Sequence, residues 1–433
     1  MKKLLRGARI IDPSQNLDDT RDILIINGCI AEIKEKIEIS DVEETDLSGM
    51  IVTPGLIDMH AHFRDPGYEY KEDIESGSKS AAAGGFTTVA CMPNTAPPID
   101  NGALVEYVKS KTSKISKIKI LPIGCVSKGQ EGKEITEMGD MAQAGAVAFS
   151  DDGKPVADSS LMRKAMVYAS MFDRVIIDHC EDPALFEGGQ INEGRVSTLL
   201  GLTGIPAAAE EIMVARDILL AKEMGTMVHI AHISTKGSVE LIRKAKSEGV
   251  RVTCEVTPHH LTLTEEAVRN YDTNAKVNPP LRTQEDLKAL LEGLKDGTID
   301  AIATDHAPHH IDEKDIEFDK AAFGLVGLET ALGLVLTKIV GEGGLSLNKA
   351  VEKMTSGPAK ILGLHMGTIK IGAPADITVI DPNRVWTVDK DKFFSKGRNT
   401  PFNGWELKGK AVLTIVDGKT AYSEINTIGN TGI

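Results

Sequence analysis

The central part of the chain repeats one pattern, a short apolar run followed by a segment with helical periodicity. Near-continuous apolar runs of this length are typical of parallel strands that are buried on both faces. Eight such runs are present: LIDMHAHF, FTTVACMPN, KILPIGCVS, AVAFSDDG, RVIIDHCED, TMVHIAHIS, RVTCEVTPHH and AIATDHAPHH. Helix-patterned segments separate most of them, among them SKSAAAGG, LMRKAMVYASMF, AAEEIMVARDILLAKEMG, SVELIRKAKSEG and LKALLEGLKDG. Eight strand–helix units over about 300 residues predict an α/β fold with a TIM (β/α)8 barrel.

The two ends of the chain have a different hydrophobic pattern. Short β-rich runs and turns fill the first fifty residues, and the same pattern returns in GTIKIGAPADITVID, RVWTVD and AVLTIVDGKTAY. Such alternation is typical of antiparallel strands. We therefore expect both termini to pair into one small β-sandwich domain, made of residues 1–54 and 366–433, with the barrel in residues 55–365.

Composition narrows the functional class. The chain has 433 residues and a formal net charge of −14, with 63 acidic against 49 basic residues, which argues against a nucleic-acid-binding surface. No apolar stretch approaches the roughly 18 residues of a membrane span, and the N-terminus lacks the pattern of a secretory signal. Five scattered cysteines without CxxC spacing are typical of a reducing compartment. We expect a cytoplasmic protein.

Nearly every predicted barrel strand ends in a polar or ionisable cluster. These clusters are HAHFR, MPN, SDDG, DHCED, AHIS, TPHH and TDHAPHH, and five of the seven contain histidine. The carboxyl ends of the strands form the active-site face of a TIM barrel, whereas the opposite end serves stability. The sequence therefore predicts a histidine-rich active site at this rim.

Four histidines at these strand ends are candidate metal ligands. His60 and His62 lie at i and i+2 on the first strand, so both side chains can point into the mouth of the barrel. His179 and His232 follow the fifth and sixth apolar runs at the same height, which favours a second metal position. His229 lies three residues before His232, faces the other way and is expected to be structural.

Carboxylates complete the candidate site. Asp305 follows the eighth strand, where it could bind a metal and exchange a proton with a water molecule. On the fourth strand, GAVAFSDD contains no lysine, and alternation along it favours Asp152 over Asp151 as an anionic ligand between two metal ions, with Asp151 left as the alternative. Nitrogen and oxygen ligands without cysteine, in a site open to water, fit catalytic Zn²⁺.

Taken together, these motifs resemble the dihydroorotases of the amidohydrolase superfamily that lack a bridging lysine. The matching blocks span nearly the whole chain: HAHFRDPG, MPNTAPP, FSDDG, DHCED, HIST, EVTPHHL, KVNPPLR, ATDHAPH, FGLVGLET and NTPFNGW. The resemblance implies a reversible, zinc-dependent interconversion of dihydroorotate and N-carbamoyl-aspartate in pyrimidine biosynthesis.

The resemblance also implies roles for individual residues. His60 and His62 would hold the first zinc ion and His179 and His232 the second, with Asp152 between them and Asp305 as ligand and proton shuttle. Substrate contacts would come from His62, Arg64, Asn94, Asn278, His309, Phe323 and Gly324. The residue types agree, because the planar fork of Arg64 matches a carboxylate and the two asparagines can hydrogen-bond the amide edges of a ring.

One departure and two alternatives accompany this interpretation. Relatives usually carry proline where this chain has Ala322, and the charged loop from His310 to Ala322 could act as a lid. A hydantoinase, dihydropyrimidinase or allantoinase would share the fold, but typically with a carbamylated lysine and without a clamp for a substrate carboxylate. A non-catalytic homologue that partners aspartate transcarbamoylase is the other alternative. Partners can be expected only by analogy with relatives. We expect a homodimer, and an active enzyme could associate with aspartate transcarbamoylase as well.

Overall fold

The computed structural model describes residues 2–425, and it contains the predicted barrel. Parallel ladders join the first three barrel strands to one another and the last five to one another. Parallel bridges from Gly124 to Phe149 and from Ala61 to His306 close the ring. The strands are β6 (Leu56–Ala61), β7 (Phe86–Cys91), β8 (Lys119–Pro122), β9 (Ala148–Phe149), β10 (Val175–Asp178), β13 (Val228–Ile230), β14 (Val252–Val256) and β15 (Ala301–Ile302).

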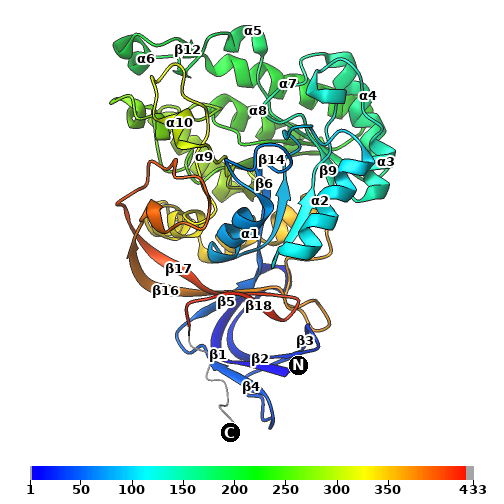
Figure 1. Ribbon diagram of the computed structural model, residues 1–433, viewed down its shortest axis with the longest axis vertical. Helices are drawn as coiled ribbons and strands as arrows, with labels where there is room; N and C mark the ends of the chain where they lie inside the picture. Colours follow the sequence, from blue (N-terminus) through cyan, green and yellow to red (C-terminus); the bar gives the residue numbers. More distant parts are fainter. Residues whose placement is uncertain (1, 426–433) are drawn as a thin grey trace.

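Helices follow the barrel strands and cover the outside of the ring (Figure 1). Those that connect successive strands or follow the last one are α1 (Ile74–Ala83), α2 (Gly102–Ile115), α3 (Met138–Ala144), α4 (Ser159–Ser170), α7 (Ala207–Met224), α8 (Lys236–Ser247), α9 (Gln284–Asp296) and α11 (Ala331–Leu334), which continues as π-helical turns over Val335–Glu342. The shorter helices are α5 (Pro183–Phe186), α6 (Arg195–Leu200), α10 (Ile311–Lys314), α12 (Leu347–Met354) and α13 (Ser356–Ile361). The short strands β11 (Ile191–Asn192) and β12 (Gly204–Ile205) pair within the loop after β10.

The pattern of α8 shows why these segments are helical. Val239, Ile242 and Ala245 recur at a spacing of three and are buried, while Glu240, Arg243 and Lys244 between them are exposed. The Thr235 side chain accepts a hydrogen bond from the backbone N–H of Ser238 and so caps the first turn. Among residues 2–425, no helix is both long and apolar enough to cross a membrane.

Both ends of the chain build one β domain, as predicted. Its eight strands run in the order β18-β17-β16-β5-β1-β2-β3, with β4 also paired to β1. They are β1 (Lys2–Asp12), β2 (Leu17–Ile26), β3 (Cys29–Lys34), β4 (Glu43–Asp46), β5 (Ile51–Pro54), β16 (Ile377–Thr387), β17 (Glu406–Val416) and β18 (Lys419–Ser423). Figure 1 shows the strands from the two parts of the sequence, β1–β5 in blue and β16–β18 in orange to red, side by side below the barrel.

The pairing within this domain is not purely antiparallel, which corrects one expectation. β4 and β5 both pair with β1 in parallel. Parallel pairing needs a crossover, and here the connection between β3 and β4 returns the chain to the end of the sheet where β1 begins. The junction of the two ends is antiparallel, with Ile377 opposite Pro54 and Ile380 opposite Ile51. Apolar side chains from both ends share one core.

The placement of β5 orients the whole barrel. Only Gly55 separates β5 from β6, so the first barrel strand leaves the β domain and its carboxyl end points away from it. Thr414 of β17 donates a hydrogen bond of 2.7 Å to the carbonyl of Ala82 and so ties the two parts together. The carboxyl ends of the strands therefore form the far rim of the barrel.

Candidate active site and metal centre

A cavity of about 260 Å³ opens at the carboxyl ends of the barrel strands. Its walls contain every residue that the sequence analysis assigned to substrate contact and all the predicted metal ligands except His60, which is fully buried beneath them. Residues that are up to 262 positions apart in the chain, from His62 to Gly324, thus line one space. The expected convergence of the strand ends is observed.

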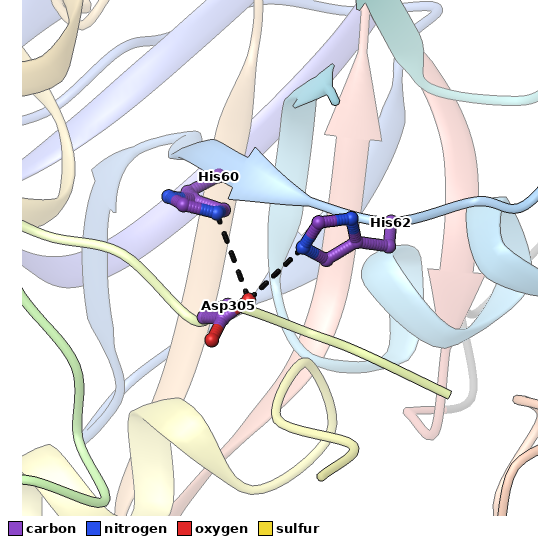
Figure 2. A group of neighbouring side chains, drawn as sticks. All are labelled: His60, His62 and Asp305. Carbon is purple, nitrogen blue, oxygen red and sulfur yellow. Dashed lines mark hydrogen bonds and ion pairs between the residues drawn. The ribbon is translucent and has the colours of Figure 1, made fainter. Parts of the chain in front are cut away.

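His60, His62 and Asp305 form one corner of the site (Figure 2). The Nε2 atom of His62 lies 3.1 Å from Oδ1 of Asp305, and Nε2 of His60 lies 3.6 Å from the same oxygen. Asp305 has a φ of +46°, and His232 and Arg64 also have positive φ, at +28° and +58°. Backbone conformations of this kind are costly for residues other than glycine and concentrate at functional sites.

Asp152 lies in the middle of the histidines. Its Oδ1 is 3.4 Å from Nε2 of His60, 3.5 Å from Nδ1 of His179 and 3.4 Å from Nε2 of His232. Oδ2 is 3.4 Å from Nε2 of His62. Burial opposes the ionised form, but His60 and the other histidines hold the pKa of this carboxyl well below its usual range.

Asp151, the alternative at this position, points elsewhere. Its carboxylate accepts hydrogen bonds from the backbone N–H groups of Val126, at 2.8 Å, and Ser127, at 3.1 Å. Burial raises its pKa to about 6. Asp151 therefore holds the loop after β8, and of the two neighbouring carboxylates only Asp152 faces the histidines.

The donor set fits a metal centre. Among the described residues, Nε2 of His60 and Oδ1 of Asp152 are buried without a hydrogen-bond partner. Leaving such atoms unsatisfied is costly, and a cation coordinated by them would remove that cost. Of the three groups of described side chains whose ligand atoms lie within 4.8 Å of one another, two are at this site: His60, His62 and Asp305, and His60, Asp152 and His232.

Glu255 is an important residue that the sequence analysis missed. It lies on β14, and its Oε1 is 2.6 Å from Nδ1 of His60. Its Oε2 is 3.3 Å from Nε2 of His229, the histidine predicted to be structural. Burial alone would raise the pKa of Glu255, but His60 and His229 outweigh burial and lower it to about 2. A carboxylate within VTCEV, a run with the pattern of a buried strand, was the available signal.

Arg64 and His309 line one side of the cavity. The Nε of Arg64 donates to the carbonyl of Pro308 at 3.3 Å, and its Nη2 lies 3.4 Å from Nε2 of His309. Nε2 of His309 is also 2.9 Å from the carbonyl of Phe323. Burial lowers the pKa of Arg64, which nevertheless remains a cation at any physiological pH. Among residues 2–425, no carboxylate lies within 4.0 Å of the guanidinium, so it is available to an anionic ligand.

The two predicted asparagines also border the cavity. Oδ1 of Asn94 lies 2.9 Å from Nδ1 of His62 and so orients that ring. Nδ2 of Asn278 lies 3.3 Å from Glu181 and 3.2 Å from Nε2 of His179. Oδ1 of Asn278 is buried and has no hydrogen-bond partner among the described residues. That free acceptor in the cavity wall suits an N–H group of a ligand.

Comparison with known proteins places these features in a family. A model described as "Dihydro-orotase-like" matches residues 49–238, and one described as "Amidohydrolase family" matches residues 320–422. The chain is 55% identical over 426 residues to a dihydroorotase of Syntrophus aciditrophicus, covering 98% of this chain and 100% of that one. A dihydroorotase of Geobacter metallireducens is 56% identical over 423 residues, with the same coverage of both chains.

Solved structures give the fold. An L-hydantoinase (dihydropyrimidinase) from Arthrobacter aurescens superposes with a TM-score of 0.89 at 29% identity, over 99% of this chain and 98% of that one. A dihydropyrimidinase from Brevibacillus agri gives 0.84 at 22% identity, over 100% and 97%. The architecture is therefore shared with these two structures, while the much higher sequence identity is to proteins named dihydroorotase.

Proposed function

This chain belongs to the dihydroorotase family, and from that premise we propose that it reversibly hydrolyses the ring of dihydroorotate to N-carbamoyl-aspartate in pyrimidine biosynthesis. The observation that carries the proposal is the cluster of four histidines and two aspartates at the base of one cavity, beside the half-buried Arg64. A lysine is absent from the described cavity walls. This absence does not favour the alternative of a hydantoinase-type centre bridged by carbamylated lysine.

The metal centre that we propose holds two zinc ions. His60 and His62 would hold one ion and His179 and His232 the other, with Asp152 between them and Asp305 as a further ligand. When bound, zinc lowers the pKa of water towards about 7 and stabilises charge that develops on a substrate oxygen. Oxygen and nitrogen donors without cysteine suit this ion.

The protein's own residues would position the substrate and move the proton. Arg64, Asn94 and His309 would hold the exocyclic carboxylate of dihydroorotate, since a planar guanidinium pairs with a carboxylate. Asn278 and the backbone of Phe323 and Gly324 would meet the edges of the ring.

Asp305 is the proposed proton shuttle. An Asp305 carboxylate oxygen would accept a proton from the attacking water and deliver it to the departing ring nitrogen, and the order reverses in the direction of ring closure. General acid–base catalysis of this kind contributes about 10²–10⁴-fold.

The test is a spectrophotometric dihydroorotate assay on protein of measured metal content. We expect turnover that a chelator abolishes and added zinc restores, with about two zinc ions per chain. Hydantoin and allantoin serve as competing substrates and should be turned over at least 100-fold more slowly. Faster turnover of hydantoin or allantoin than of dihydroorotate would favour the hydantoinase-type alternative. Protein that contains no metal and has no activity would favour the non-catalytic alternative.

Three further expectations belong to the same proposal. We propose that residues 1–54 and 366–433 form one domain and residues 55–365 the other; residues 1 and 426–433 of this division lie outside the described residues. We also propose that the enzyme is a cytoplasmic homodimer and that it can associate with aspartate transcarbamoylase. Light scattering of the purified protein, alone and mixed with that enzyme, measures both associations.

A further inference from the structure

Two lysine side chains are buried beside the segment that carries Phe323 and Gly324. Lys276 is 1% exposed and Lys314 is 3% exposed. Within residues 2–425, neither ammonium group lies within 4.0 Å of a carboxylate. Burying an ammonium group without an opposite charge destabilises the fold. The hydrogen bonds that the two ammonium groups donate therefore point to a role for them.

Lys314 binds the carbonyls on both sides of Phe323. It is the last residue of α10, and its Nζ donates to the carbonyl of Ala322 at 2.7 Å and to that of Gly324 at 3.0 Å. The carbonyl of Phe323 itself lies 2.9 Å from Nε2 of His309. Three consecutive carbonyls of this cavity wall are thus fixed by side chains.

Lys276 connects the same wall to the neighbouring loop. Its Nζ donates to the carbonyl of Phe318 at 2.7 Å and lies 4.5 Å from the centre of the Phe323 ring. Its backbone carbonyl accepts a hydrogen bond of 2.8 Å from the N–H of Gly324. Asn278, with its free buried amide oxygen, follows two residues later. Lys276 therefore holds the segment 318–324 at three points, with its ammonium group at Phe318 and Phe323 and with its backbone carbonyl at Gly324.

The electrostatics agree with tight burial. Burial lowers the pKa of Lys314 to about 7, with a further contribution from the nearby charge of Lys276, whose own pKa burial lowers to about 8. Methionine would fill a similar volume without this cost. Packing alone therefore does not explain the two amines.

We propose that Lys276 and Lys314 are positioning residues for the reaction: they hold the backbone of Phe323 and Gly324 at the height where the substrate ring binds. This inference rests on the proposed function. Because the fixed groups contact the ring rather than the metal centre or Asp305, their loss is expected to weaken substrate binding more than it slows the chemical step.

The experiment compares Lys314→Met and Lys276→Met with Lys320→Met in the metal-loaded enzyme. Lys320 lies in the same loop, but its exposed ammonium group only reaches Glu317, at 3.4 Å. We expect KM for dihydroorotate to rise at least tenfold in the first two variants, with kcat within threefold and zinc content unchanged. Hydrogen exchange of residues 315–324 should quicken at least tenfold in these two variants alone.

The two proposals fail in different ways. Wild-type protein that does not turn over dihydroorotate would overturn the proposed function. Hydrogen exchange of the lysine variants would still show whether the lysines fix the loop. Active wild-type enzyme with unchanged KM and unchanged exchange in both buried-lysine variants would overturn the positioning role alone. If one variant fails to fold, the other variant carries the same test. A fall in kcat as large as the rise in KM, together with loss of zinc, would also count against the positioning role.

Discussion

The Nδ1 atom of His60 lies 2.6 Å from Oε1 of Glu255, and both side chains are fully buried. Because the carboxylate accepts the Nδ1 proton, the ring presents Nε2 to the cavity, toward Asp152 and Asp305. A second contact joins the other oxygen of Glu255 to His229. Glu255 therefore fixes both the tautomer and the direction of a candidate ligand, as carboxylates behind ligating histidines do.

Replacing Glu255 with glutamine should weaken metal binding about 10–100-fold, because the ring of His60 loses its charged partner. Competition with a chromogenic chelator measures this change. Glu292→Gln, at an exposed position on α9, is the matched control and should leave zinc affinity unchanged. Equal affinities in the two variants would show that Glu255 has no such role.

Asp305→Asn should reduce kcat by about 10²–10⁴-fold while most of the zinc remains bound. The amide cannot accept the proton that the proposed mechanism transfers, whereas the four histidines and Asp152 still surround the site. Steady-state kinetics together with metal analysis of the same preparation separate the two effects. Near-normal turnover would contradict the shuttle role.

Hydrophobic periodicity was sufficient to predict the barrel, since all eight apolar runs became parallel strands. The site residues could be located because the carboxyl ends of barrel strands meet at one rim, whatever their separation in sequence. Alternation along the fourth strand favoured Asp152 over Asp151 but left both open, and the structure turns only Asp152 toward the histidines.

Other features depend on contacts that no local pattern encodes. Glu255 was overlooked because its partners His60 and His229 come from other strands. Lys276 and Lys314 resemble ordinary loop lysines in sequence, and only the packing of three loops makes them buried. The parallel pairing of β4 and β5 with β1 likewise depends on the path of a long connection, which strand patterning does not determine.

Glu329 should make stability depend on pH. Burial raises its pKa from 4.5 to about 7, although the N–H groups of Phe394, at 2.9 Å, and Ser395, at 3.1 Å, favour the ionised form. The folded protein therefore keeps a proton that the unfolded chain releases above pH 4.5. The contribution of this group to stability is full below pH 4.5 and is lost as the pH rises through about 7.

Glu329→Gln removes this titration, so relative to the variant the wild type should lose on the order of 1 kcal/mol between pH 5 and pH 8. Thermal melting of both proteins across this range measures the difference. Melting temperatures that run parallel from pH 5 to pH 8 would exclude the effect.

Gly324→Ala should impair the cavity wall that the two buried lysines fix. Gly324 has a φ of +129°, and an added Cβ would lie 2.7 Å from Cβ of Ala307 and 3.0 Å from its carbonyl oxygen. Gly249→Ala is the matched control, since Gly249 also has a positive φ, +79°, but nothing within 4 Å of the new methyl group. Both variants should lose about 1–2 kcal/mol of stability from the backbone conformation alone. Only Gly324→Ala must also move the wall at Phe323, so kcat/KM for dihydroorotate should fall at least tenfold there and stay unchanged in the control. Equal kcat/KM in the two variants would mean that the wall tolerates displacement and does not meet the substrate.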